Sequence, residues 1–267
     1  MKIKTAYYTK PLVYITCNPM GGVRKSRIAS LIYHCLVCMG LNPLVVALDT
    51  NDSLIHQIRK EKCLPKAEIL RWDINDETAT LESLHKVLMK ALEEVRPVII
   101  DLPAKGGLTL GIQTLLRTGL LEHATVIGLV PVVPDDKAAA GGIEALEAIA
   151  PDIWIKFEFY GKHKAPENEI FQTLDALNPD AIVQIGELTS GESNLWVEEL
   201  PVLPPQLADY VASGGLVTAK WTIFRNYWMQ AKMSIDAALA KAVPQLADMV
   251  EAAKSTPPKT QPAKQPA

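Results

Sequence analysis

The sequence predicts an α/β fold: a doubly wound, mostly parallel sheet flanked by helices, followed by a C-terminal helical extension. Two observations predict the sheet. Short apolar runs rich in Val, Ile and Leu alternate along the chain with stretches of helical periodicity. These runs are apolar throughout, which is typical of parallel strands covered by helices on both faces. A third observation predicts the extension, because the chain beyond Pro204-Pro205 turns helical.

Each expected strand is a short apolar run that ends at a polar or turn-forming residue. The run at 67–71 is the weakest, and we expect it at an edge of the sheet. The runs at 44–48 and 97–101 are notable because an aspartate stands at the end of each. In chain order, the expected strands are 12–17, 44–48, 67–71, 97–101, 125–133, 152–159 and 181–185.

Helices are expected between these strands. Gly40 follows the first of them, at the position where glycine commonly ends a helix. Leucines at three- and four-residue spacing line one face of 78–95. Pro134-Asp135-Asp136 has the residue types that begin a helix. In chain order, the expected helices are 25–39, 53–60, 78–95, 108–121, 137–149 and 169–177.

The C-terminal part is expected to complete a single domain rather than to form a second one. No break in composition divides residues 1–254, and the helical part begins at about residue 205. A long amphipathic run covers about 217–253. The remaining segment, 255–267, is rich in proline and almost free of apolar side chains, so we expect a disordered tail.

Composition narrows the possible functions. The net charge of −3 gives no general attraction to nucleic acid or to anionic membranes. No apolar run is long enough to span a bilayer, and the N-terminal residues lack a signal-peptide core. Cys35 and Cys38 lie three apart on an apolar helix face, without the further ligands that a metal site needs. We therefore expect buried thiols in a cytoplasmic protein.

Residues 13–31 carry the most informative motif. An apolar strand ends at Asn18-Pro19, then Gly21-Gly22 form a turn, and Lys25-Ser26 open a helix. This is the layout of a phosphate-binding loop, in which backbone N–H groups and a helix N-terminus face the phosphate. A lysine there can reach the terminal phosphates, and the hydroxyl after it can ligate Mg²⁺. The alternative is an ordinary glycine-rich turn with a solvated Lys-Ser pair.

The spacing fits one variant of this loop better than the common form. G-x-x-x-x-G-K-[ST] is not met, because Pro19 and Arg24 stand where its glycines should be. K-G-G-x-G-K-[ST] fits with two departures, Met20 and Arg24. Two strand ends support the functional interpretation. Since parallel strands place their carboxyl ends at one edge of the sheet, Asp49 and Asp101 are expected near the loop, where they can help to hold Mg²⁺ on a nucleotide.

Together these segments resemble the ParA/MinD group of P-loop ATPases, which has a deviant loop with an additional signature lysine. The resemblance covers the first 150 residues, and its finer features are most similar to ParA-like proteins of plasmid maintenance and conjugation. Four segments carry it: MGGVRKS at 20–26, LVVALDTND at 44–52, PVIIDLPAKGG at 97–107 and IGLVPVVPDDKAAAGGIEAL at 127–146.

The resemblance implies a P-loop NTPase fold, ATP and Mg²⁺ as ligands, and roles for particular residues. It implies that Lys25 lies on the β/γ phosphates and also serves catalysis. It places the water that attacks the phosphate near Asn51 or Asp52. The implied phosphate-binding residues are Gly21, Gly22, Val23, Arg24, Lys25, Ser26 and Arg27, and the implied metal-binding residues are Ser26, Asp49 and Asp101.

Three departures from the family pattern qualify these expectations. Met20 replaces the signature lysine, which in the family crosses a dimer interface to the partner's nucleotide. Asn51 replaces an acid that positions the attacking water, so hydrolysis should be slow unless Asp52 substitutes. Arg24 replaces a glycine that packs close to the phosphates, and it can either contact phosphate through its guanidinium or crowd the pocket.

The C-terminal part contains an aromatic and basic segment, 220–228, that has two interpretations. It can be a DNA-facing or partner-docking surface, as in ParA-like proteins. Alternatively, Trp221, Phe224 and Trp228 form one buried helix face with solvated charges, which is the interpretation we favour. A membrane-binding terminal helix is not expected, because the chain ends in a polar, proline-rich segment.

Three functions are compatible with these patterns. The first is a ParA-like ATP-binding switch that forms a homodimer and works with nonspecific DNA and a plasmid-encoded DNA-binding or transfer protein. The second is a degenerate relative that keeps the fold as a protein-interaction module. The third is a synthetase of the dethiobiotin or cobyric-acid kind, although no charged substrate pocket is evident after the second acidic strand. The first is the interpretation that we carry forward.

Overall fold

The structure is a computed structural model, and its description covers most of the chain. The described residues are 10–48, 54, 58, 69–71, 77–104, 112–113, 115–133, 136–160, 169–199, 202–213 and 219–255. The predicted helix 53–60 is represented there only by Leu54 and Ile58, both helical and buried. The predicted tail lies outside the described residues beyond Ser255. Within the part described, no helix is both long and apolar enough to cross a membrane.

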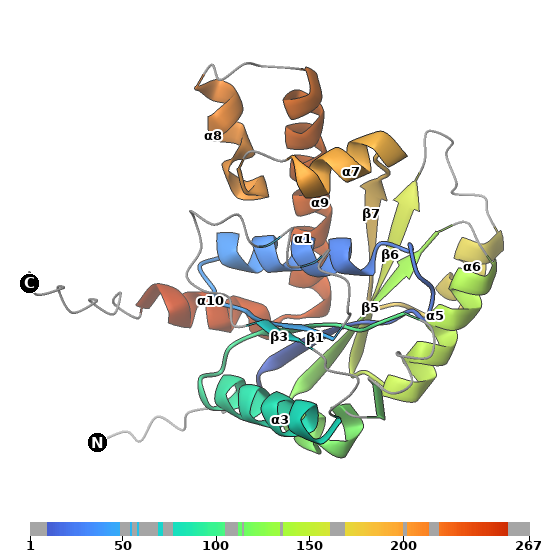
Figure 1. The fold of residues 1–267 in the computed structure, drawn as a ribbon, viewed down its shortest axis with the longest axis vertical. Helices are drawn as coiled ribbons and strands as arrows, with labels where there is room; N and C mark the ends of the chain where they lie inside the picture. The colour runs from blue at the N-terminus through green and yellow to red at the C-terminus, as the bar shows by residue number, and fades with distance from the viewer. Residues whose placement is uncertain are drawn as a thin grey trace, which may run out of the picture.

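The described strands form one parallel sheet, in the order β3-β2-β4-β1-β5-β6-β7 (Figure 1). Every pair of neighbouring strands is parallel. The doubly wound sheet that the sequence predicts is therefore confirmed, and β3 lies at an edge as expected. The bounds are β1 Leu12–Thr16, β2 Leu44–Ala47, β3 Ile69–Arg71, β4 Val98–Asp101, β5 Thr125–Val132, β6 Ile153–Tyr160 and β7 Ala181–Gly186.

Two apolar layers cover the sheet, and the alternation of side chains along each strand assigns residues to them. In β1, Leu12 and Tyr14 belong to one layer, whereas Val13 and Ile15 belong to the other. All four side chains are buried. A strand that is buried on both faces has no polar positions to alternate with apolar ones, which explains the continuous apolar runs in the sequence.

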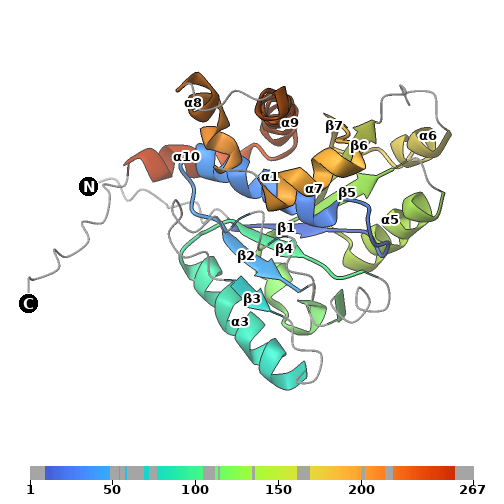
Figure 2. The same ribbon diagram turned by 45° about the horizontal axis from the view of Figure 1, so that its top comes forward.

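Helices from distant parts of the sequence cover each face (Figures 1 and 2). The first face carries α1 Lys25–Cys38, α7 Ser190–Glu198, α8 Leu207–Ala212, α9 Ala219–Ala242 and α10 Gln245–Ser255. The second carries α3 Glu77–Glu93, α5 Asp136–Ile149 and α6 Glu169–Asp175. Two short 3-10 turns, η1 Leu120–His123 and η2 Pro204–Gln206, complete the described elements.

The structure corrects two expectations for the C-terminal part. The run predicted at 217–253 is two helices, because α9 ends at Ala242 and α10 begins at Gln245. Pro244 lies between them, and proline cannot continue a helix because it lacks an N–H donor. Helix α7 was not predicted. Its N-terminus is fixed by a capping box, in which Thr189 and Glu192 exchange side-chain and backbone hydrogen bonds.

The cysteine prediction is correct in part. Cys17 and Cys35 are buried, and burial raises the pKa of the Cys17 thiol to about 12. Cys38 is exposed, so the expectation of buried thiols is wrong at this position. Cys38 is the last residue of α1, where the helix leaves the apolar layer. No group of three or more metal-binding side chains occurs among the residues whose structure is described.

The aromatic segment of α9 is mainly part of the core. Phe224 and Trp228 are buried, and the ring of Phe224 lies 5.5 Å from that of Trp196 in α7, edge to face. Trp221 is half-buried, and Lys220 places its ammonium 4.4 Å from the Trp221 ring centroid. This arrangement supports the interpretation of 220–228 as a buried face with solvated charges.

Candidate functional site

The candidate loop lies where the winding of the sheet reverses. β1 pairs with β4 on one side and with β5 on the other, so the chain leaves β1 at the centre of the sheet. Open parallel sheets bind ligands at this position, outside the carboxyl ends of the strands. Residues 17–24 connect β1 to α1 there.

The loop backbone adopts the conformation that a tight glycine turn requires. Gly22 has φ of +79°, which suits glycine because it has no Cβ. Arg24 has φ of +74° and is the N-cap residue of α1, without a side-chain capping bond. The side chain of Arg24 does not accept hydrogen bonds from the N–H groups in the first turn of α1. A bound anion can accept from these N–H groups instead.

The left-handed backbone at Arg24 leads to a prediction about stability. A non-glycine residue there costs roughly 1–2 kcal/mol. Arg24→Gly removes this strain together with the side-chain contacts, whereas Arg24→Ala removes only the contacts. We expect urea denaturation to show Arg24→Gly at least as stable as the wild type and about 1 kcal/mol more stable than Arg24→Ala. Equal stabilities of the two variants would contradict a strained backbone at this position.

Lys25 and Ser26 begin α1 beside the loop. Lys25 is 6% exposed, and its ammonium donates to the Met20 carbonyl at 2.7 Å. The side chain therefore folds back over the loop that precedes it. Ser26 is half-buried, whereas Gly21 and Gly22 are exposed. The predicted loop residues are thus brought together, with Lys25 lying across a glycine turn that faces solvent.

Asn18 fastens the start of the loop to the neighbouring elements. It is fully buried, and its amide donates to the carbonyls of Ala138 at 2.8 Å and Pro131 at 3.3 Å. Its side-chain oxygen accepts from the Met20 N–H at 2.9 Å. The loop is therefore tied both to the end of β5 and to the first turn of α5.

Two glycines of α5 allow this close packing. A Cβ on Gly141 would lie 2.5 Å from Cγ of Pro19, and one on Gly142 would lie 2.9 Å from Val130. Real Cβ contacts are not this short, so a side chain at either position would displace the loop or β5. The Gly-Gly pair in the fourth family-like segment therefore has a structural reason.

Asp101 lies at the end of β4, next to β1 in the sheet. It is 1% exposed, and its Oδ1 accepts from the Thr16 hydroxyl at 2.9 Å. The same hydroxyl accepts from the Leu102 N–H at 3.0 Å. Thr16 was not predicted as a site residue, although a buried threonine at the end of an apolar strand is a signal that could have identified it.

The described oxygen donors fit a magnesium ion. Ser26 supplies a hydroxyl at the start of α1, and Asp101 supplies a buried carboxylate at the adjacent strand end. Mg²⁺ prefers oxygen ligands and is commonly held by one or two carboxylates together with phosphates and waters. Asp49, Asn51 and Asp52 lie outside the described residues, so their predicted roles stay predictions.

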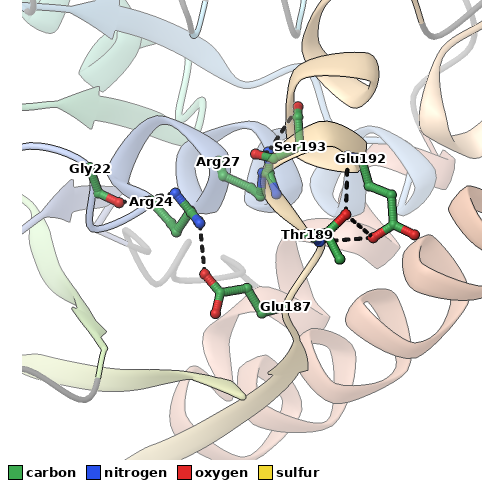
Figure 3. Close-up of polar contacts among 7 residues, drawn as sticks. All are labelled: Gly22, Arg24, Arg27, Glu187, Thr189, Glu192 and Ser193. Atoms are coloured by element: carbon green, nitrogen blue, oxygen red, sulfur yellow. Dashed lines mark hydrogen bonds and ion pairs between the residues drawn. The ribbon is translucent and has the colours of Figure 1, made fainter. Parts of the chain in front are cut away.

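Two arginines, one in the loop and one in α1, contact residues that follow β7 (Figure 3). Arg24 forms an ion pair with Glu187 at 2.6 Å, and Arg27 donates to the Ser193 hydroxyl at 2.6 Å. Arg27 is 5% exposed, and this burial lowers the pKa of its guanidinium. The contacts of Arg27 thus join α1 to α7, and its inclusion among phosphate-binding residues stays a prediction.

Several solved structures are similar to this chain over most of its length. MinD, the septum site-determining protein of Pyrococcus horikoshii complexed with Mg-ADP, has a TM-score of 0.54 and 14% identity, covering 87% of this chain and 99% of its own. Apo McdA of Cyanothece has a TM-score of 0.53 and 14% identity, covering 85% and 99%. An ATP complex of Cyanothece McdA has a TM-score of 0.51 and 13% identity, covering 85% and 97%.

The chain has the fold of MinD/ParA-type P-loop ATPases. This confirms the fold that the sequence resemblance implies. At 13–14% identity the likeness shows the fold alone. No protein-family model matches the chain, and no curated protein matches it in sequence.

Proposed function

We propose that this protein is a ParA-like switch that binds ATP with Mg²⁺ and hydrolyses it slowly. One observation carries the proposal: a glycine turn with Lys25 folded across it begins α1 at the centre of a doubly wound parallel sheet. Backbone N–H groups, a helix N-terminus and a buried lysine at this point suit the phosphates of a nucleotide. The nucleotide-bound proteins of the same fold support this choice of ligand.

The residues of the loop would act on the nucleotide in a simple way. Lys25 would exchange the Met20 carbonyl for phosphate oxygens, which are stronger acceptors for an ammonium group. Ser26 and Asp101 would hold the magnesium ion, whose charge offsets that of the phosphates. Glycine at 21 and 22 leaves the backbone accessible to the ligand. Asn51 has no carboxylate to act as a general base, so slow turnover is part of the proposal.

The cellular role that we propose is plasmid partition, maintenance or conjugative transfer, with a homodimer as the active state. The partners would be nonspecific DNA and a plasmid-encoded DNA-binding or transfer protein. The four family-like segments of the sequence support this role. The aromatic side of α9 is mostly buried, so it is not available to bind DNA. A DNA-binding surface on this helix would have to use the solvated cationic side chains of α9 instead.

A specific observation also favours the second candidate, a non-hydrolysing scaffold. Arg24 occupies a glycine position of the loop and is already paired with Glu187 within the chain. A loop that is braced in this way can serve a stable interaction module without nucleotide. The two candidates differ in one property, which is the affinity of the loop for nucleotide.

Titration of the purified protein with ATP and ADP, each with and without Mg²⁺, tests the proposal. Calorimetry gives the affinities, and light scattering on the same samples gives the oligomeric state. We expect saturable binding that strengthens with Mg²⁺. An absence of binding under every condition would overturn the switch and leave the scaffold.

Asn51 provides a test of the hydrolysis mechanism. Asn51→Asp restores the carboxylate that the family uses to orient the attacking water, and general-base assistance typically contributes a factor of about 10²–10⁴. We expect phosphate release from ATP to rise by at least about tenfold. Unchanged turnover in a variant that binds ATP normally would show that another departure limits hydrolysis.

Met20 provides a test of the dimer. A methionine cannot neutralise phosphate across an interface, and Arg24 is held by Glu187 of the same chain. We therefore expect weak dimerisation with ATP, because like charges that oppose each other cost several kcal/mol. Met20→Lys should increase the dimer fraction with ATP in analytical ultracentrifugation. A tight ATP-dependent wild-type dimer that Arg24→Gly leaves unchanged would place the interface on another surface.

A further inference from the structure

The ion pair between Arg24 and Glu187 joins the candidate loop to the residue that directly follows the edge strand β7. The two residues are 163 positions apart in the sequence, and their charged atoms lie 2.6 Å apart. The same guanidinium donates to the Gly22 carbonyl at 3.2 Å. Figure 3 shows the Arg24 side chain between the glycine turn and Glu187. A cation within the candidate phosphate loop is thus engaged by a carboxylate of the protein itself.

This contact can open without moving the backbone around it. The Arg24 and Glu187 side chains are 27% and 29% exposed, so water can solvate both charges when they separate. The Glu187 N–H donates to the Tyr160 carbonyl at 2.6 Å, which fixes the backbone of Glu187 to the end of β6. Rotation of side chains is therefore sufficient to break the pair.

The neighbouring contact would stay in place when the pair opens. Arg27 is buried and bonded to Ser193, and the capping box of Thr189 fixes the first turn of α7. The two arginines thus differ in their surroundings: one forms a buried contact, whereas the other is accessible to solvent and lies in the loop. Only the accessible one is positioned to change partners.

We propose that Glu187 is a built-in competitor of the nucleotide phosphates for Arg24, and this inference rests on the proposed nucleotide binding. In the free protein Glu187 holds the guanidinium, and on binding Arg24 turns to the phosphates. Arginine suits phosphate because its planar fork can form two charge-assisted hydrogen bonds. If the ion pair must break when the nucleotide binds, the free energy of binding becomes less favourable by the free energy of the ion pair. Glu187 therefore weakens nucleotide binding.

Calorimetric titration of Glu187→Gln with Mg-ATP and Mg-ADP tests the inference. Accessible ion pairs are weak, so we expect affinity for Mg-ATP to rise by about two- to fivefold. Glu199→Gln is the matched control. Glu199 also forms an ion pair, with Lys220 at 2.7 Å, but it lies at the C-terminal end of α7, whereas Glu187 precedes the N-terminal end. This control should bind as the wild type does. An unchanged or weaker affinity of Glu187→Gln would overturn the inference.

A second background separates competition from a general effect of charge. Removing Glu187 also makes the surface less negative, which alone can favour ATP. If Glu187 acts through Arg24, Glu187→Gln should have no effect in the Arg24→Ala background. An equal rise in both backgrounds would overturn the competitor while leaving nucleotide binding intact. Absence of binding in every variant, wild type included, would instead overturn the proposed function.

Discussion

Lys25→Ala is expected to weaken Mg-ATP binding by about ten- to a hundredfold while leaving the fold intact. Hydrogen bonds to charged groups contribute roughly 1.5–3 kcal/mol, and 1.4 kcal/mol corresponds to a factor of ten. In the structure the Lys25 ammonium donates a 2.7 Å hydrogen bond to the Met20 carbonyl. Loss of this charge-assisted hydrogen bond should lower the free energy of unfolding by roughly 1.5–3 kcal/mol, which is less than the roughly 5–15 kcal/mol by which folded proteins are typically stable. Calorimetry and urea denaturation measure the two effects separately.

Lys254→Ala is a suitable control for charge, since Lys254 is 63% exposed and pairs only with Glu251 on α10 among its described ion pairs. This variant should bind Mg-ATP as the wild type does. Equal affinity of wild type and Lys25→Ala would contradict a phosphate-binding role of the loop. A large loss of stability in Lys25→Ala would mean that the lysine serves the fold first.

Asn18→Ala is expected to have the largest effect on stability, about 3 kcal/mol in urea denaturation. The substitution removes three hydrogen bonds of a fully buried side chain, which join it to the Met20 N–H and to the carbonyls of Pro131 and Ala138. Each such hydrogen bond contributes about 1 kcal/mol to stability, which gives a total of about 3 kcal/mol. Because the amide also ties the loop to α5, nucleotide affinity should fall in the same variant.

Asn226→Ala is the matched control, because Asn226 is an exposed asparagine of α9 that accepts from Arg225. Exposed substitutions of this kind change stability by less than about 0.5 kcal/mol. If Asn18→Ala is no less stable than Asn226→Ala, the hydrogen bonds of Asn18 do not hold the loop in place.

Much of the fold could be predicted from the sequence, because strands that are buried on both faces appear in it as continuous apolar runs. The strand at 12–16 is an example, since both of its faces lie in apolar layers. Helix α7 was not predicted, because it contains three weak helix formers, Ser190, Gly191 and Asn194. Its stability comes instead from Trp196, whose ring packs on Phe224 and Tyr227 of α9. The T-x-x-E spacing of Thr189 and Glu192 is the signal in the sequence that could have predicted the start of this helix.

The candidate site could be predicted only where it is local in sequence. The turn, Lys25 and Ser26 form one continuous motif, so spacing alone brings them together. The partner of Arg24 lies directly after β7 and that of Arg27 lies in α7, both more than 160 residues away, and nothing in the loop specifies them. The sequence left open whether Arg24 contacts phosphate or crowds the pocket. The structure adds Glu187 as a third participant.

Helix α9 has a consequence for the synthesis of this protein. It packs on β6, β7 and α1, and its buried Phe224 and Ile235 complete the apolar layer that contains Tyr14 of β1. At about 5–20 residues per second, ribosomes complete β7 about 3–11 seconds before they complete α9. During that interval the sheet face beside α1 lacks its cover. The nascent chain therefore exposes an aggregation-prone apolar surface until α9 has been made. We expect the yield of folded protein to be higher when it is expressed at low temperature and with chaperones.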